Sequence, residues 1–122
     1  MTRLITLSVF IIRPFSELFK EDAQLVYKKY CLDPFKKYIS ILPGSRVSEI
    51  ENLLPTYIEF INFHANKNED YVYLIPASDH RIFETINNLV PKSLPVKISL
   101  DSAKDFLSIS TYSVVTSGTA TL

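Results

Sequence analysis

Short apolar, β-branched runs alternate with longer amphipathic stretches along the chain, and this alternation limits the possible folds most. The strand-like runs cover residues 4–12, 38–42, 71–75, 96–100 and 113–116. The helix-like stretches cover residues 17–30, 48–54, 55–64, 79–89 and 102–110. Strands that alternate with helices at this spacing predict βαβ units and a mostly parallel sheet. The sequence therefore predicts an α/β fold, and the length of 122 residues allows one domain.

Prolines set several of the expected element ends. Pro76 is expected to end the strand at residues 71–75. A proline inside a helix clashes with the preceding turn, so Pro55 predicts a break or a kink. Because proline is tolerated at the first position of a helix, a second helix could open at Pro55 and continue to about His64. The polar residues 66–70 predict a turn.

Composition and charge argue against several classes of protein. The chain has 13 basic and 13 acidic residues, and a net charge of zero argues against a nucleic-acid partner. A single cysteine, Cys31, excludes an internal disulfide. The longest mostly apolar run, residues 4–12, is far shorter than the ~20 residues of a membrane-spanning helix, so we expect a buried strand or an edge strand. His64 and His80 lack partners at metal-ligand spacing, so no metal site is expected.

The chain has only two glycines, whereas average usage predicts about eight or nine. Gly44 and Gly118 each follow a predicted strand, and residues 117–122 look like the start of a helix. Ligands of open α/β sheets bind at the carboxyl ends of the strands, where a glycine lets the backbone approach and a helix N-terminus favours phosphate. The alternative is a tight turn with a helix cap and no ligand. Neither turn fits GxGxxG or GxxxxGK[ST], which argues against a classical dinucleotide site or P-loop.

Side chains around the two glycines add groups suited to a phosphate. Arg46 offers a charge-assisted contact. The remaining candidates offer hydroxyl groups, and they are Ser45, Ser117, Thr119 and Thr121.

These motifs together resemble one family. Residues 37–50, KYISILPGSRVSEI, with Leu53-Leu54-Pro55 after them, resemble the LPGSR-x-SEI…LLP signature of the lipid-A-disaccharide synthases. Residues 117–122, SGTATL, resemble the SGTATLE signature that follows about 70 residues later in that family. The resemblance covers about residues 16–122. Residues 1–15 are an N-terminal segment whose relation to the family is left open. If residues 10–14 correspond to the family's VGHP segment, Ile12-Arg13 stands where the family has Gly-His.

The resemblance implies a GT-B glycosyltransferase, which has two Rossmann-like domains and an active site between them. Such an enzyme transfers 2,3-diacylglucosamine from UDP to 2,3-diacylglucosamine 1-phosphate in lipid A biosynthesis, at the cytoplasmic face of the bacterial inner membrane. Residues 16–122 would then be an incomplete UDP-sugar-binding domain, a partial Rossmann-like sheet that corresponds to half of the C-terminal domain. A companion fragment of the same enzyme and peripheral contact with the membrane are the further partners implied.

The resemblance also implies roles for the residues around the glycines. The donor's diphosphate would be bound by Gly44, Ser45, Arg46, Ser117, Gly118 and Thr119, with Thr121 as a further candidate. Glu49 would be either a ligand of Arg46 or an acid in the first turn of a helix. No cofactor is implied. The catalytic base lies in the family's N-terminal domain, and a glutamate is expected directly after Leu122, so we expect this chain alone to be inactive.

Two other functions fit the same residues. One is a small standalone nucleotide-binding module that keeps only the turn chemistry. The other is a non-catalytic interaction protein on a βαβ scaffold. An incomplete half-domain should expose apolar faces and aggregate, so a folded, soluble monomer would favour the standalone module.

Overall fold

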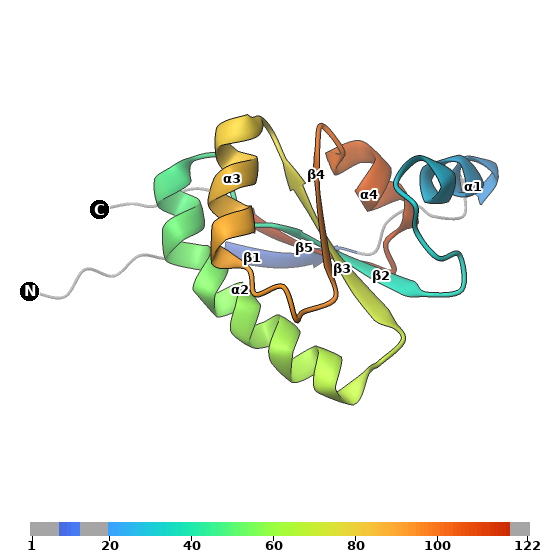
Figure 1. The fold of residues 1–122 in the computed structure, drawn as a ribbon, viewed down its shortest axis with the longest axis horizontal. Helices are drawn as coiled ribbons and strands as arrows, with labels where there is room; N and C mark the ends of the chain where they lie inside the picture. Colours follow the sequence, from blue (N-terminus) through green and yellow to red (C-terminus); the bar gives the residue numbers. More distant parts are fainter. Residues whose placement is uncertain (1–7, 13–19, 118–122) are drawn as a thin grey trace, which may run out of the picture.

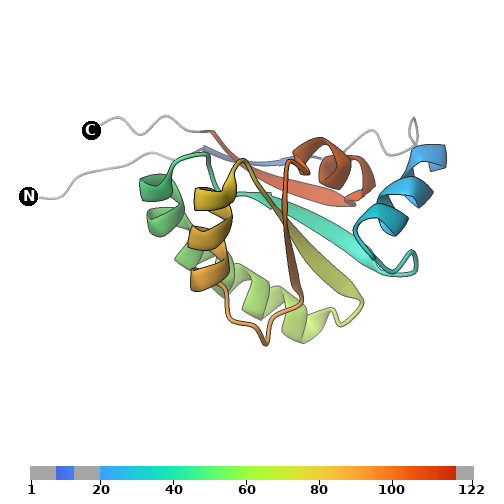
Figure 2. The same ribbon diagram turned by 45° about the horizontal axis from the view of Figure 1, so that its top comes forward.

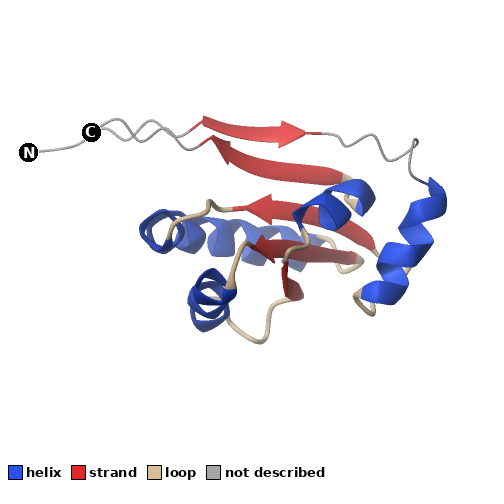
Figure 3. Ribbon diagram, turned by 90° about the horizontal axis from the view of Figure 1, so that it is seen from above, coloured by secondary structure: helices blue, strands red, loops and turns tan. Residues whose placement is uncertain are grey.

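The computed structural model describes residues 8–12 and 20–117, which form one five-stranded sheet with helices on both faces (Figure 1). The strand order is β1-β5-β2-β3-β4. The strands are β1 (Ser8–Ile12), β2 (Lys37–Leu42), β3 (Tyr71–Ala77), β4 (Val96–Leu100) and β5 (Tyr112–Ser117). Four of them run parallel, and β1 pairs antiparallel with β5 at one edge (Figure 3). The predicted α/β fold and the mostly parallel sheet are confirmed.

The order of the four parallel strands explains where a ligand would bind. Counted along the chain, β2, β3, β4 and β5 lie in the spatial order 4-1-2-3. Read from the opposite edge, this order is 3-2-1-4, which is the first part of the doubly wound order 3-2-1-4-5-6. The strand order reverses between β2 and β5. Such a switch point leaves a crevice at the carboxyl ends of the strands.

Four helices cover the sheet (Figure 2). They are α1 (Lys20–Lys29), α2 (Val47–Lys67), α3 (His80–Leu89) and α4 (Ala103–Ile109). Helices α2 and α3 bury one face of the sheet, where Ile39, Ile41 and Tyr73 contribute to the core. Helices α1 and α4 cover the other face, where Tyr38 and Leu74 are buried. Because β2 and β3 are buried on both faces, they appear in the sequence as continuous apolar runs.

Of the two alternatives predicted at Pro55, a break or a kink, the break is wrong. Helix α2 continues from Val47 to Lys67 with Pro55 inside it, and it therefore also includes part of the turn predicted at residues 66–70. Ile50 and Leu54 before the proline and Tyr57 after it are all buried against the sheet. The packing of this continuous face outweighs the lost hydrogen bond, and Pro55 itself lies on the exposed side of the helix.

The predicted end of a strand at Pro76 is also wrong, because β3 continues through Pro76 to Ala77. The pairing of β3 with β2 stops at Leu74, whereas Pro76 is still in register with Ser99 of β4. At Pro76 the strand has a neighbour on one side only, so the missing N–H costs little in the ladder.

The two ends of the sequence are only partly covered. The sequence predicts either a buried strand or an edge strand at residues 4–12. The described part of this segment is β1, which is an edge strand. The structure places Ser117 at the end of β5 and not in a helix. The predicted helix at residues 118–122 lies outside the described residues.

Helix α4, which borders the candidate site, is braced by α1. The Tyr30 hydroxyl donates a 2.8 Å hydrogen bond to Oδ2 of Asp105, and Lys29 Nζ lies 3.2 Å from the same oxygen. The Tyr30 ring also meets Phe106 edge-on, with 4.9 Å between the ring centroids. These contacts hold the pKa of Asp105 below its usual value, chiefly because the carboxylate accepts the Tyr30 hydrogen bond.

Candidate functional site

A hollow of about 510 Å³ lies at the carboxyl ends of the parallel strands, and we call it the strand-end hollow. One wall is the turn after β2, with Gly44 and Ser45. The opposite wall is the turn from β4 into α4, with Asp101, Ser102 and Lys104. The hollow extends over the ends of β2, β3 and β4 and reaches Val115 of β5, so it borders the switch point between β2 and β5, where ligands of open α/β sheets usually bind.

Gly44 gives the first wall its shape. Its φ of +126° is a backbone conformation that residues with a side chain rarely adopt. A Cβ added there would lie 3.1 Å from the Cβ of Glu49. The glycine therefore allows the chain to turn sharply from β2 and brings the start of α2 close to the sheet edge.

The first turn of α2 leaves backbone donors available. Arg46 is the N-cap residue, and its side chain makes no capping hydrogen bond. Ile50 N–H donates to the Arg46 carbonyl in the first intrahelical bond, at 3.0 Å. Glu49 lies in this first turn, as the second of its two predicted roles requires, and no ion pair joins it to Arg46 in the part of the chain that the structure describes.

A second hollow, also of about 510 Å³, lies between the starts of α2 and α3, and we call it the helix hollow. Ser45 and Arg46, which directly precede α2, and Ser48 within α2 line it on one side, and Arg81 lines it from α3. Asp79 also borders this hollow, and its Oδ1 accepts a 2.9 Å hydrogen bond from Ile82 N–H as the N-cap of α3.

The predicted site residues are divided between the two hollows. Gly44 and Ser45 line the strand-end hollow, whereas Ser45 and Arg46 line the helix hollow. Ser45 is thus the residue shared by both. The backbone of Ser117 ends β5, and the other residues of the second predicted turn lie outside the described part of the chain: Gly118, Thr119 and Thr121.

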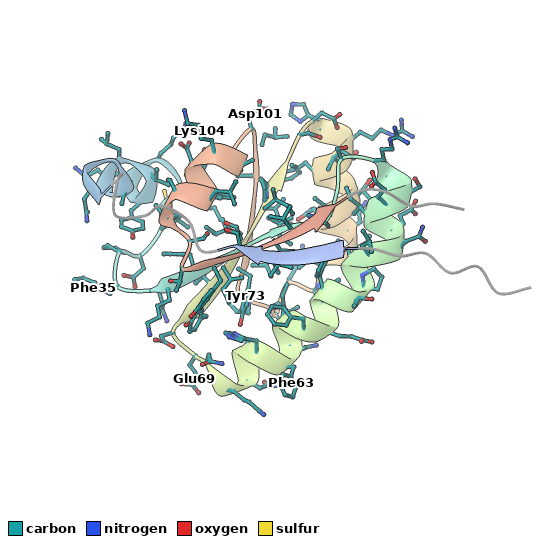
Figure 4. The ribbon with its side chains drawn as sticks, turned by 180° about the vertical axis from the view of Figure 1, so that it is seen from behind. Phe35, Phe63, Glu69, Tyr73, Asp101 and Lys104 are labelled. Carbon is teal, nitrogen blue, oxygen red and sulfur yellow. The ribbon has the colours of Figure 1, made fainter. Side chains whose placement is uncertain are left out.

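The sequence reasoning missed the second wall of the strand-end hollow. Figure 4 shows Asp101 and Lys104 at one edge of the molecule and Glu69 and Phe63 at the opposite edge. Asp101 adopts a φ of +48°, and its N–H donates a 3.0 Å hydrogen bond to the Ala77 carbonyl. Because an aspartate takes this left-handed position, the turn contains no glycine to mark it in the sequence.

The clearly shifted pKa values belong to groups away from both hollows. Burial raises the pKa of Tyr73 to about 12, and its hydroxyl is hydrogen-bonded to Nδ1 of His64 near the far end of α2. Burial likewise raises the pKa of Tyr38 to about 12. The linings of the two hollows contain carboxylates as well as cations, and their hydroxyl groups, backbone N–H groups and cations are the groups that can bind an anion.

Two absences hold for the residues that the structure describes. No group of three or more His, Cys, Asp or Glu side chains among them is placed to hold a metal ion. No helix in that part of the chain is long and apolar enough to cross a membrane.

Comparison with known proteins gives a consistent result. The sequence model of the family described as lipid-A-disaccharide synthetase matches residues 7–122. The lipid-A-disaccharide synthase of Alteromonas mediterranea is 36% identical over 90 residues, which are 69% of this chain and 24% of that protein. The synthase of Acinetobacter baylyi is 34% identical over 128 aligned positions, which cover 94% of this chain and 32% of that protein.

A third relative, the synthase of Azoarcus sp., is 27% identical over 115 residues, 89% of this chain and 29% of that protein. The chain therefore spans about a quarter to a third of the length of these relatives. The sequence signatures, the partial doubly wound sheet and the extent of these matches agree: the chain belongs to the lipid-A-disaccharide synthetase family.

Proposed function

We propose that this chain is part of the nucleotide-binding domain of a lipid-A-disaccharide synthase and that the strand-end hollow receives the UDP part of UDP-2,3-diacylglucosamine. The observation that carries the proposal is the position of the Gly44-Ser45 turn, the central part of the family signature, on the wall of a hollow at the sheet's switch point.

The sheet register places the ends of the two strands that precede the signature turns side by side. Strands β2 and β5 are parallel neighbours, and Leu42 is in register with Val115. Gly44 and Ser117 each follow two residues later, so β2 and β5 end at the same edge of the sheet. In the proposal, backbone N–H groups and hydroxyls of both turns contact the donor's diphosphate. Arg46 lines the adjoining helix hollow, which shares Ser45 with the strand-end hollow, and in the proposal its guanidinium reaches from there to neutralise the charge that develops on the UDP leaving group.

In the proposed reaction, the hydroxyl of 2,3-diacylglucosamine 1-phosphate attacks the donor sugar, and UDP leaves. A base must accept the proton of that hydroxyl. The proposal places this base in the N-terminal domain of the enzyme, at the cytoplasmic face of the inner membrane. This chain contributes donor binding and has no turnover alone. A transfer assay with both lipid substrates tests this statement, and turnover by the isolated chain above background would contradict it.

Calorimetry with UDP tests the binding role directly. We expect the full chain to bind UDP and Arg46→Ala to lose most of that binding, because the charge-assisted contact is removed. Lys67→Ala is the matched control, since it removes one positive charge from the other end of α2. Equal UDP affinity of wild type and Arg46→Ala would contradict the role of Arg46. UDP binding without turnover, even with an N-terminal domain from a relative added, would favour the standalone nucleotide-binding module instead.

A further inference from the structure

Two arginines from different helices line the helix hollow. Arg46 directly precedes α2, and Arg81 is the second residue of α3. The two helices pack against each other, so their first turns border the same space. Both side chains are exposed, and neither guanidinium makes an ion pair with any residue in the described part of the chain. Sequence reasoning singled out Arg46 but gave no role to Arg81.

The other groups around this hollow do not neutralise the two arginines through direct contact. Two carboxylates, Glu51 and Asp79, border the hollow. Asp79 is engaged at its own helix, where Oδ1 accepts the Ile82 N–H. Neither acid lies within ion-pair distance of Arg46 or Arg81. Each guanidinium therefore keeps its planar set of donors for a ligand, and the Ser45 and Ser48 hydroxyls add two smaller donors.

We propose that the helix hollow binds a phosphate group between Arg81 and Arg46. Guanidinium groups match the geometry of phosphate oxygens and bind them in a bidentate manner. Ser45 lines both hollows, so a phosphate held here lies next to a nucleotide in the strand-end hollow. The ligand chemistry is a phosphate group of a sugar or nucleotide, and it has two sources: the diphosphate of the donor or the phosphate monoester of the acceptor. That the donor and the acceptor are these two compounds rests on the proposed function, and the experiment below distinguishes between them.

Binding calorimetry on the full chain tests this site, with UDP, uridine and glucosamine 1-phosphate as the probes. We expect Arg81→Ala to weaken the binding of at least one phosphate-containing probe by about tenfold, as the loss of one charge-assisted contact predicts. Uridine, which has no phosphate, should bind equally to both proteins. Arg81→Lys should recover only part of the affinity, because lysine keeps the charge but lacks the planar fork.

Lys92→Ala is the matched control, because it removes one positive charge just beyond the other end of α3. Circular dichroism of Arg81→Ala checks that the fold is retained, as expected for an exposed side chain. Weaker binding of UDP to Arg81→Ala assigns the site to the donor. Weaker binding of glucosamine 1-phosphate alone assigns it to the acceptor.

The same experiment separates this inference from the proposed function. If wild type binds UDP and Arg81→Ala binds both phosphate probes equally well, the phosphate site is refuted and the nucleotide site stands. If wild type does not bind UDP but binds glucosamine 1-phosphate through Arg81, the nucleotide site fails and the phosphate site stands. Binding of neither probe by the wild type overturns both.

Discussion

At the scale of single residues, Gly44 shapes the turn that carries the candidate site. We expect Gly44→Ala to lower the free energy of unfolding by about 1–3 kcal/mol, because its φ of +126° is strained for any side chain. The new Cβ would also meet the Cβ of Glu49 at 3.1 Å. Urea denaturation of the two proteins measures this difference.

Glu49→Ala provides the control for this substitution. It removes the carboxylate atoms of Glu49, which would lie 3.5 Å from the new methyl group, but keeps the Cβ at 3.1 Å. The cost of Gly44→Ala should therefore persist in the Glu49→Ala background. If Glu49→Ala removed the cost, contact with the carboxylate end would be the cause and the backbone explanation would be wrong.

Tyr73 links a single side chain to the pH dependence of stability. Its pKa is raised from 10.0 to about 12 by burial, so the folded state keeps the phenol proton to a higher pH than the unfolded state does. Unfolding releases this proton between pH 10 and pH 12, and the free energy of unfolding should therefore fall as pH rises through that range. Urea denaturation across this range measures the slope.

Tyr38 has a pKa raised in the same way, so two variants separate the contributions. Tyr73→Phe should make the alkaline fall in stability shallower, and the Tyr38→Phe, Tyr73→Phe double variant should make it shallower again. A slope unaltered in both variants would assign the alkaline loss of stability to other groups.

Sequence reasoning located one wall of the strand-end hollow but not the other. Gly44 and Ser45 could be predicted because a glycine after a strand is a local signal, readable without knowledge of the fold. Asp101 and Lys104 give no such signal. Only the pairing of β4 with β3 brings their turn to the same edge of the sheet, and that contact is not visible in the local pattern.

At the scale of elements, Pro55 shows how packing overrides a local rule. A proline in a helix interior lacks the N–H of one hydrogen bond and crowds the preceding turn. Pro55 is exposed, so replacing it creates no cavity in the core. We expect Pro55→Ala to raise the free energy of unfolding by about 1–3 kcal/mol, as measured by urea denaturation.

The neighbouring residue supplies the control. Thr56→Ala, also at an exposed position of α2, changes helix propensity but not the backbone hydrogen bonds, and it should stabilise the protein by less than Pro55→Ala does. An unchanged or lower stability of Pro55→Ala would show that Pro55 does not destabilise α2 and would contradict this explanation.

Element type was more predictable than element length. The strand at residues 96–100 is found with the predicted bounds, because Pro95 and the turn at Asp101 limit it on both sides. The two errors, at Pro55 and Pro76, have one origin. Proline restricts the local backbone, but its effect depends on the surrounding contacts. Buried residues on both sides of Pro55 keep the helix packed on the sheet, so the helix continues. The pairing of β3 with β2 ends before Pro76, so the strand can include a proline there.

At the scale of the whole molecule, the sequence predicts parallel strands but not their order. The alternation of strands and helices is typical of βαβ units, whereas the placement of β5 beside β2 requires long-range contacts. The antiparallel pairing of β1 was not predictable either. In the doubly wound order, a fifth parallel strand would lie beside the fourth. The fourth parallel strand here is β5, and the antiparallel strand β1 occupies the position on its outer edge.

This position of β1 has a consequence for solubility. Its five residues pair with β5 from Ser8–Ser117 to Ile12–Ser113, and β5 is the element that β1 contacts extensively in the described part of the chain. Without β1, the outer edge of β5 would present unpaired N–H and C=O groups, which pair readily with other chains. We therefore expect a chain that starts at residue 13 to self-associate more strongly than the full chain. Sedimentation velocity over a range of concentrations measures this difference. A chain that starts at Ser8 keeps β1 and is the matched control, and identical sedimentation of all three chains would show that β1 does not protect this edge.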